Sequence, residues 1–288
     1  MGAADVVPGV SGGTVAFITG IYEELLKSIS SINFKNLRHL KDYNIKSIWN
    51  EINGNFLFSV FIGILVSVFS LSRAITYFIK TYPVLVWSLF FGLIISSAYI
   101  ISKKVPNWNF QKITSYTIGV LIAYAITRLS PVENPESLLY IFLSGAIAIC
   151  AMILPGISGS FILLLMGSYS LILKALNEFD ILVITVFIFG CLLGLLSFAK
   201  LLNHLFRKYR DLTIAVLTGF LIGSLNKVWP WKVVISTRIN SSGEIVPFME
   251  KNTWPHYFEG DPNLIAAISL AVFGFIIVFF IDKISAKN

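Results

Sequence analysis

The chain has 288 residues, of which 56% are hydrophobic and 13% are charged, and its formal net charge is +7. Soluble globular domains carry about 25% charged residues, so this composition excludes an ordinary soluble protein and indicates an integral membrane protein. Basic residues beside membrane segments reflect chain orientation and anionic lipids more often than nucleic acid. Membrane lipids are therefore expected as partners, and nucleic acid is not.

An apolar stretch at residues 6–22 is the first element along the chain, and the sequence PGVSGG interrupts it at residues 8–13. Proline and glycine break a helix, and serine caps the helix that follows. Backbone groups without partners in hydrocarbon cost several kcal/mol each, so the break indicates a function for the freed amides. The earlier arm of a hairpin built on this break would need residues before Met1.

Six uncharged runs further along the chain are long enough to be predicted as membrane helices. They are residues 56–72 (extendable to 79), 84–102, 113–127, 181–199, 212–226 and 263–281. A seventh run, at residues 137–173, contains 37 residues and would measure about 55 Å as one helix, against ~30 Å of hydrocarbon. We therefore expect this run to fold back as a helical hairpin that turns at residues 155–158.

The turn of this hairpin repeats the first motif, because PGISGS at residues 155–160 follows PGVSGG at an offset of 147. Beyond the motif the correspondence continues at an offset of 127, which pairs Tyr82 with Tyr209. The change of offset places an insertion in the polar segment at about residues 30–55. Spaced identities of this kind predict a duplication, with repeats at residues 1–129 and 130–288 that form one membrane domain.

Each repeat is predicted to contain a re-entrant helical hairpin and three transmembrane helices. After an odd number of crossings the second repeat enters the membrane from the opposite side to the first. The predicted fold is therefore an all-α integral membrane protein with two inverted-topology repeats. One side then holds 14 of the 22 Lys and Arg residues, and the positive-inside rule makes that side cytoplasmic. The insertion at residues 30–55 is thus expected in the cytoplasm, and the loop at residues 227–262 outside the plasma membrane.

The two interrupted segments are the predicted substrate site. After each break a new helix starts with amide groups at the positive end of its dipole, and such positions bind phosphate. The predicted phosphate-binding residues of the motifs are Ser11, Gly12, Gly13, Thr14, Ser158, Gly159 and Ser160, and the helix breaks are Pro8, Gly9, Pro155 and Gly156. The alternative is that the glycines only allow close helix packing and the serines bond to their own helices.

Charged residues near the hydrocarbon complete the candidate site. Arg73 and Lys200 occupy equivalent repeat positions and are predicted to draw a phosphate head group into the cavity, although snorkelling to the interface explains them equally well. Asp5, Glu23 and Glu24 are candidates for coupling transport to an ion. Asp5 otherwise caps a helix end, and the two glutamates are otherwise solvated carboxylates of a cytoplasmic turn.

The sequence does not predict an enzyme, a cofactor or a metal site. His39, His204 and His256 lie far apart, without the spacing of metal ligands or of a catalytic constellation. Cys150 and Cys191 lie in uncharged runs, where a free thiol acts as a small apolar side chain, so no disulfide is expected.

Residues 3–14, AADVVPGVSGGT, resemble the signature of the bacterial and archaeal polyprenyl-phosphate transporter family, and the second copy at residues 154–159 stands where that family also has it. The resemblance implies a carrier that returns undecaprenyl phosphate, or a related polyprenyl phosphate, from the outer to the inner leaflet. Composition and spacing alone indicate an anion carrier with inverted repeats and alternating access. A channel or exporter for a small soluble anion remains the alternative, followed by an intramembrane lipid phosphatase, and homo-oligomerisation is left open.

Overall fold

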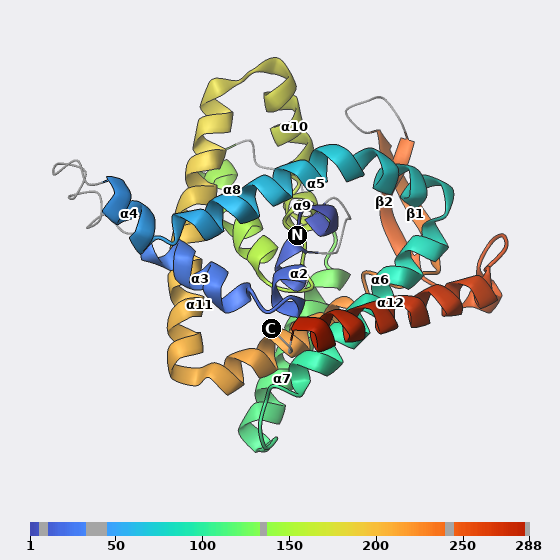
Figure 1. Cartoon of the computed structure of the whole chain (residues 1–288). Coiled ribbons are helices and arrows are strands. Elements are labelled where there is room, and N and C mark those ends of the chain that lie inside the picture. Colours follow the sequence, from blue (N-terminus) through green and yellow to red (C-terminus); the bar gives the residue numbers. More distant parts are fainter. Residues whose placement is uncertain (6–10, 33–44, 133–136, 240–244, 286–288) are drawn as a thin grey trace.

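The structure is a computed structural model that describes residues 1–5, 11–32, 45–132, 137–239 and 245–285 (Figure 1). Pro8 and Gly9, the predicted first helix break, lie outside the described residues. The elements are α1 (Gly2–Asp5), α2 (Gly12–Ile18), α3 (Tyr22–Ser31), α4 (Ile45–Glu51), α5 (Gly54–Thr81), α6 (Pro83–Ser102), α7 (Phe110–Arg128), α8 (Leu138–Ile153), α9 (Gly159–Leu165), α10 (Tyr169–Glu178), α11 (Ile181–Ser224), β1 (Lys232–Ile239), β2 (Ile245–Asn252), a 3-10 turn (Pro255–Tyr257) and α12 (Leu264–Ser285).

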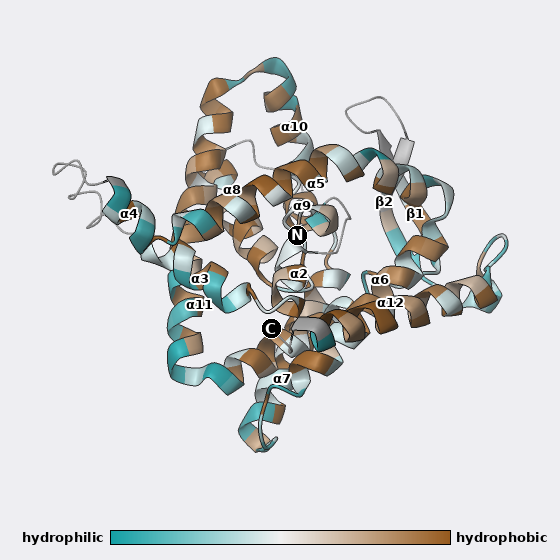
Figure 2. Cartoon of the chain, in the orientation of Figure 1, coloured by the Kyte–Doolittle hydropathy of each residue, from teal (hydrophilic) through white to brown (hydrophobic). Residues whose placement is uncertain are grey.

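Helices dominate this architecture, as predicted for an integral membrane protein. Within the described residues, α5, α6, α11 and α12 are long and apolar enough to cross a membrane, and the bent pair α9 and α10 is a fifth candidate if counted as one span. Figure 2 shows apolar residues along these long helices and polar residues on α3, α4 and the bend of α11. The predicted runs 181–199 and 212–226 form one element, α11, whose helical dihedral angles are interrupted at Tyr209.

The predicted hairpin in the run at residues 137–173 is present, since α8 rises to a turn and α9 leaves it. Its second arm differs from the expected single helix, because α9 ends at Leu165 and α10 departs at 104°. Gly167 causes this second break: its φ is +66°, a left-handed value that glycine adopts without a Cβ penalty. Gly20 has φ +78° at the corresponding place between α2 and α3.

Element boundaries recur in the two halves of the chain. Helices α2 and α3 begin 147 positions before α9 and α10, and α5 begins 127 positions before α11. Tyr82, between α5 and α6, has φ −132° and ψ 56°, and Tyr209 has φ −135° and ψ 47°. Two distant segments therefore share the same local backbone.

Close helix crossings join the two halves. A Cβ on Gly92 of α6 would overlap the backbone of Ala271 in α12, and a Cβ on Gly219 of α11 would overlap the backbone of Tyr116 in α7. Gly92 and Gly219 are 127 positions apart, the offset found in the sequence, and each half packs the last helix of the other half against one of them. The two halves are thus packed together through their last helices, and α2 and α9 lie near the centre of the molecule (Figure 1).

The long segment between α11 and α12 contains an antiparallel hairpin that the sequence did not predict. Strands β1 and β2 pair Lys232 with Asn252 and Val234 with Glu250. Trp231 Nε1 donates to the carbonyl of Pro262 (2.9 Å), which ties the base of the hairpin to the start of α12. The hairpin is thereby fixed beside the helices instead of forming a free loop.

Candidate functional site

The two sequence motifs meet in space, which is the main structural result for the site. The amide of Gly156 donates to Thr14 Oγ1 (2.9 Å), and Ser11 Oγ donates to the carbonyl of Met152 (2.7 Å). A Cβ on Gly13 would overlap the carbonyl of Ile153, so glycine is required for this approach. Ser11, Thr14 and Ser158 are buried. We refer to residues 11–14 as the first tip and to residues 152–160 as the second tip.

The first tip already has acceptors for its amides. Gly12 N donates to Asp5 Oδ1 (2.7 Å), Gly13 N to Ser11 Oγ (3.0 Å), and Thr14 N to the carbonyl of Ser11 (2.9 Å). A carboxylate at a helix N-terminus interacts favourably with the helix dipole and forms a short, charge-assisted hydrogen bond. Asp5 therefore acts as a cap, the alternative weighed for it above, and the expectation of unpaired amides is wrong for this tip.

Among the described residues, no carboxylate binds the amides of the second tip. Met152 stands 147 positions after Asp5, and a Cβ on Gly159 would lie 3.4 Å from Met152 Cβ, just as a Cβ on Gly12 would meet the Asp5 carboxylate. Ser158 forms no capping bond to α9, because its hydroxyl pairs with that of Ser160 (2.8 Å). Among the described residues, no acceptor is found for the amides of residues 159–161.

Arg73 and Lys200 are not brought to the tips. Both side chains are exposed, on α5 and α11 respectively. Within the described part of the chain, no hydrogen bond or ion pair joins either one to a tip residue. Long basic side chains on the outer surface of membrane helices reach toward the interface, so the snorkelling explanation fits this placement.

Glu23 and Glu24 lie on α3, just beyond the first tip's helix. Glu23 forms an ion pair with Arg210 (2.7 Å), and Glu24 accepts from Asn53 Nδ2 (2.8 Å). Both glutamates line a cavity of about 950 Å³ between α3, the α4–α5 junction and α11, together with Lys27. Both carboxylates are therefore paired with neighbouring side chains, and no interaction joins them to a tip among the described residues.

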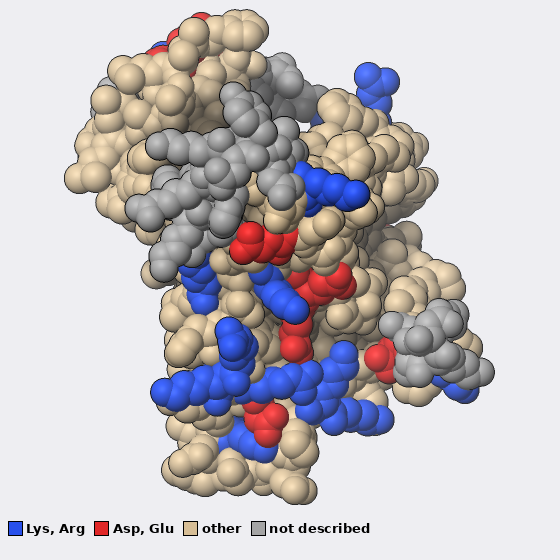
Figure 3. Space-filling view, turned by 60° about the vertical axis from the view of Figure 1, so that its left-hand side comes forward, with Lys and Arg blue, Asp and Glu red and all other residues tan. Residues whose placement is uncertain are grey.

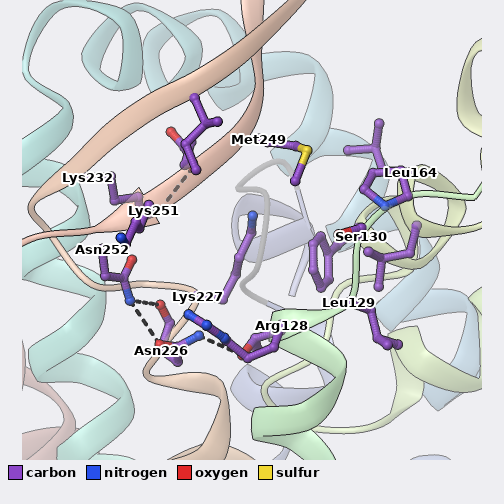
Figure 4. Close-up of a pocket in the computed structure, with 16 residues that line it drawn as sticks. Arg128, Leu129, Ser130, Leu164, Asn226, Lys227, Lys232, Met249, Lys251 and Asn252 are labelled. Carbon is purple, nitrogen blue, oxygen red and sulfur yellow. Dashed lines mark hydrogen bonds and ion pairs between the residues drawn. The ribbon is translucent and has the colours of Figure 1, made fainter.

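A second cavity, of about 300 Å³, lies between the end of α7, α9, the end of α11 and the β-hairpin (Figure 4). Arg128, Lys227, Lys232 and Lys251 line it, with Glu250 as the acidic member of the described lining. We call it the basic cavity. The sequence analysis counted these residues only as loop charges, since they come from separate segments and share no motif. Their convergence depends on the unpredicted hairpin.

No metal centre is found within the described residues, because no three His, Cys, Asp or Glu side chains gather there. Cys150 and Cys191 are free thiols. What the tips and cavities offer instead is backbone amides, hydroxyl groups and cations, which bind anions.

Comparison of the sequence with known proteins finds relatives that are named for the transport of a phosphate-bearing lipid. A family model described as VCA0040-like, undecaprenyl phosphate translocase-like, matches residues 1–246. A Vibrio cholerae serotype O1 protein named polyprenyl-phosphate transporter is 47% identical over 259 residues, which cover 90% of this chain and 84% of that protein. A Staphylococcus aureus protein of the same name is 31% identical over 250 residues, covering 80% and 83%. No solved structure matches the chain.

Proposed function

The chain belongs to the VCA0040-like family of undecaprenyl phosphate translocase-like proteins, and on that premise we propose that it carries a polyprenyl phosphate from the outer to the inner leaflet of the plasma membrane by alternating access. Such a lipid has an isoprenoid tail that is stable in hydrocarbon and a phosphate that is not. The carrier therefore shelters only the head group while the tail stays in the bilayer. Transport in this scheme needs a small polar site and no chemical step.

The observation that carries this proposal is the direct contact between the two tips. Gly156 N donates to Thr14 Oγ1, so two helix starts that are 142 residues apart in sequence meet at one buried place. Discontinuous helices that meet near the bilayer midplane form the substrate sites of many secondary transporters. In the proposal the phosphate binds between the tips, with the amides of residues 159–161 as its first donors.

The proposed orientation rests on the distribution of basic residues. Figure 3 shows a band of Lys and Arg side chains on the face that carries α3 and the bend of α11. By the positive-inside rule this face is cytoplasmic in the proposal, and the β-hairpin lies outside. The similar backbone breaks at Tyr82 and Tyr209 support two repeats, which we propose have inverted topology.

Leaflet transfer of a polyprenyl phosphate in proteoliposomes tests this function. The double variant Ser11→Leu with Ser158→Leu fills the tips with apolar side chains and should abolish transfer. The matched control is Ser70→Leu with Ser197→Leu, a repeat-related pair of exposed serines on α5 and α11, which should transfer normally. Normal transfer by a folded tip variant would overturn the site assignment.

Competition and product analysis test the other two functions. A carrier that recognises the lipid should be inhibited far better by a long-chain polyprenyl phosphate than by inorganic phosphate. Equal competition would favour a channel or exporter for a soluble anion. Release of inorganic phosphate from the lipid would instead indicate a phosphatase.

A further inference from the structure

The basic cavity gathers four cations in a small space, which is unusual unless an anion binds there. Arg128 is in the last turn of α7, Lys227 follows α11, and Lys232 opens β1, while Lys251 lies on β2. Figure 4 shows these side chains around one cavity. Glu250 is the acidic residue of the described lining, so the lining carries three more positive than negative charges. Like charges that line one small cavity repel each other, and a bound counter-ion would offset this repulsion.

The two most buried cations lack strong internal partners. Lys232 Nζ, with a side chain only 6% exposed, lies 3.5 Å from Glu250 Oε2 and 3.9 Å from the centre of the Trp87 ring. It forms no hydrogen bond to any described residue. Lys227 Nζ lies 4.5 Å from the Phe161 ring centre and has no ion pair in the described part of the chain. Ring contacts offset only part of the cost of removing an ammonium from water.

Burial also lowers the pKa of both lysines, since a dry environment disfavours the charged form. The pKa of Lys232 falls to about 8 through desolvation, although Glu250 opposes the change. The pKa of Lys227 is lowered for the same reason. A bound dianion would favour the charged form of both groups, so the electrostatics of the cavity suit such a ligand.

The cavity has an apolar side as well as a basic one. Leu164 and Leu165 of α9 line it together with Ile235 and Met249 of the hairpin. Helix α9 is also the helix that starts at the second tip, whose amides have no described acceptor. A guest with a phosphate at one end and hydrocarbon at the other matches this lining, and it would lie along the helix that leads to the tip.

We propose that the basic cavity is a binding site for a phosphomonoester joined to an apolar chain, where the head group is held before it passes along α9 to the tips. A phosphomonoester carries about −1.5 to −2 charges at neutral pH, which the surplus of cations in the cavity matches better than a singly charged diester does. Naming the transported lipid as the guest rests on the function proposed above. The anion site itself does not.

Isothermal titration calorimetry on the full chain in lipid nanodiscs tests the site. The probes are farnesyl phosphate, farnesol and inorganic phosphate. Lys227→Gln should weaken farnesyl phosphate binding about tenfold and leave farnesol unaffected, because only the charge-assisted contact to phosphate is lost. The matched control is Lys174→Gln, which removes an exposed positive charge from α10 outside the cavity and should change nothing.

Arg128→Gln keeps the test decisive if the buried Lys227→Gln variant fails to fold. Arg128 is exposed, so its substitution leaves the core intact and should still weaken farnesyl phosphate binding several-fold. Wild-type affinity in folded Arg128→Gln and Lys227→Gln would overturn the proposal. Equal affinity for inorganic phosphate and farnesyl phosphate would overturn the apolar half of it.

The tip variants separate this proposal from the transport function. Ser11→Leu with Ser158→Leu should lose leaflet transfer but retain farnesyl phosphate binding at the basic cavity. If the wild-type chain binds farnesyl phosphate through Lys227 but transfers no lipid, the anion site stands and the transport function is refuted. If the wild-type chain transfers lipid but the cavity variants bind farnesyl phosphate as wild type does, only the proposed cavity site is refuted.

Discussion

The first and second tips have nearly the same sequence but different electrostatics. Asp5 fills the amide site of α2, while Met152, its counterpart, leaves the amides of α9 without a described acceptor. Similar motif sequences thus produce one tip whose first amide is bound by a carboxylate and one whose amides have no acceptor among the described residues. Under the function proposed above, this difference makes the second tip the one that binds the phosphate, whereas Asp5 already occupies the amides of the first tip.

The largest expected effect comes from making the second tip resemble the first. Met152→Asp places a carboxylate where it can reach the amides that start α9, and this internal anion would exclude a phosphate. We expect leaflet transfer to fall at least tenfold, since a like charge repels the head group in a dry site. The measurement is the initial rate in proteoliposomes.

Met152→Asn is the control for this substitution, because asparagine has nearly the same shape as aspartate but carries no charge. This variant should retain most of the transfer rate. Equal losses of transfer rate in Met152→Asp and Met152→Asn would mean that transfer depends on packing at residue 152 and not on the absence of a carboxylate beside the α9 amides.

The reverse change opens the first tip. Asp5→Asn keeps an oxygen that can accept from Gly12 N but removes the charge that offsets the α2 dipole. The free energy of unfolding should fall by about 0.3–1 kcal/mol, and transfer should stay within a few-fold of wild type. Thermal unfolding and the transfer assay measure the two effects. A stable Asp5→Asn protein without transfer would instead identify Asp5 as a coupling residue.

Helix α9 starts at the second tip and lines the basic cavity, so pH should affect binding on this side of the protein. Lys232, with a pKa of about 8, is charged below that pH and becomes neutral above it, so the cavity loses a cation as pH rises. Burial lowers the pKa of Lys227 as well. Farnesyl phosphate binding should therefore weaken several-fold between about pH 7 and pH 9.

The control for this pH dependence is Lys232→Met, which should bind more weakly at pH 7 and show a flatter pH profile. Calorimetric titrations at several pH values measure it. An affinity that rises with pH, or a wild-type profile in Lys232→Met, contradicts the assigned role of this lysine.

Local chemistry explains which of these features the sequence could predict. Pro155 and Gly156 break a helix through their own backbone preferences, so the hairpin and its turn followed from residue types alone. The bond between Thr14 and Gly156 depends on tertiary packing, and no local pattern encodes it. The basic cavity was missed for the same reason. Its cations come from different elements, and they converge only because the hairpin folds against α7 and α9.

The smallest expected effect concerns the acids that follow only the first tip. Glu23 pairs with Arg210 on the protein surface, and the second half has Ser170 at the corresponding position. Exposed ion pairs contribute about 0–1 kcal/mol, so Glu23→Gln should lower the unfolding free energy by less than 1 kcal/mol and leave transfer unchanged. Arg210→Gln removes the other partner and should give the same small loss. A large loss of transfer in Glu23→Gln alone would show that this carboxylate does more than pair with Arg210, and the functional difference between the halves would then extend from the tips to α3.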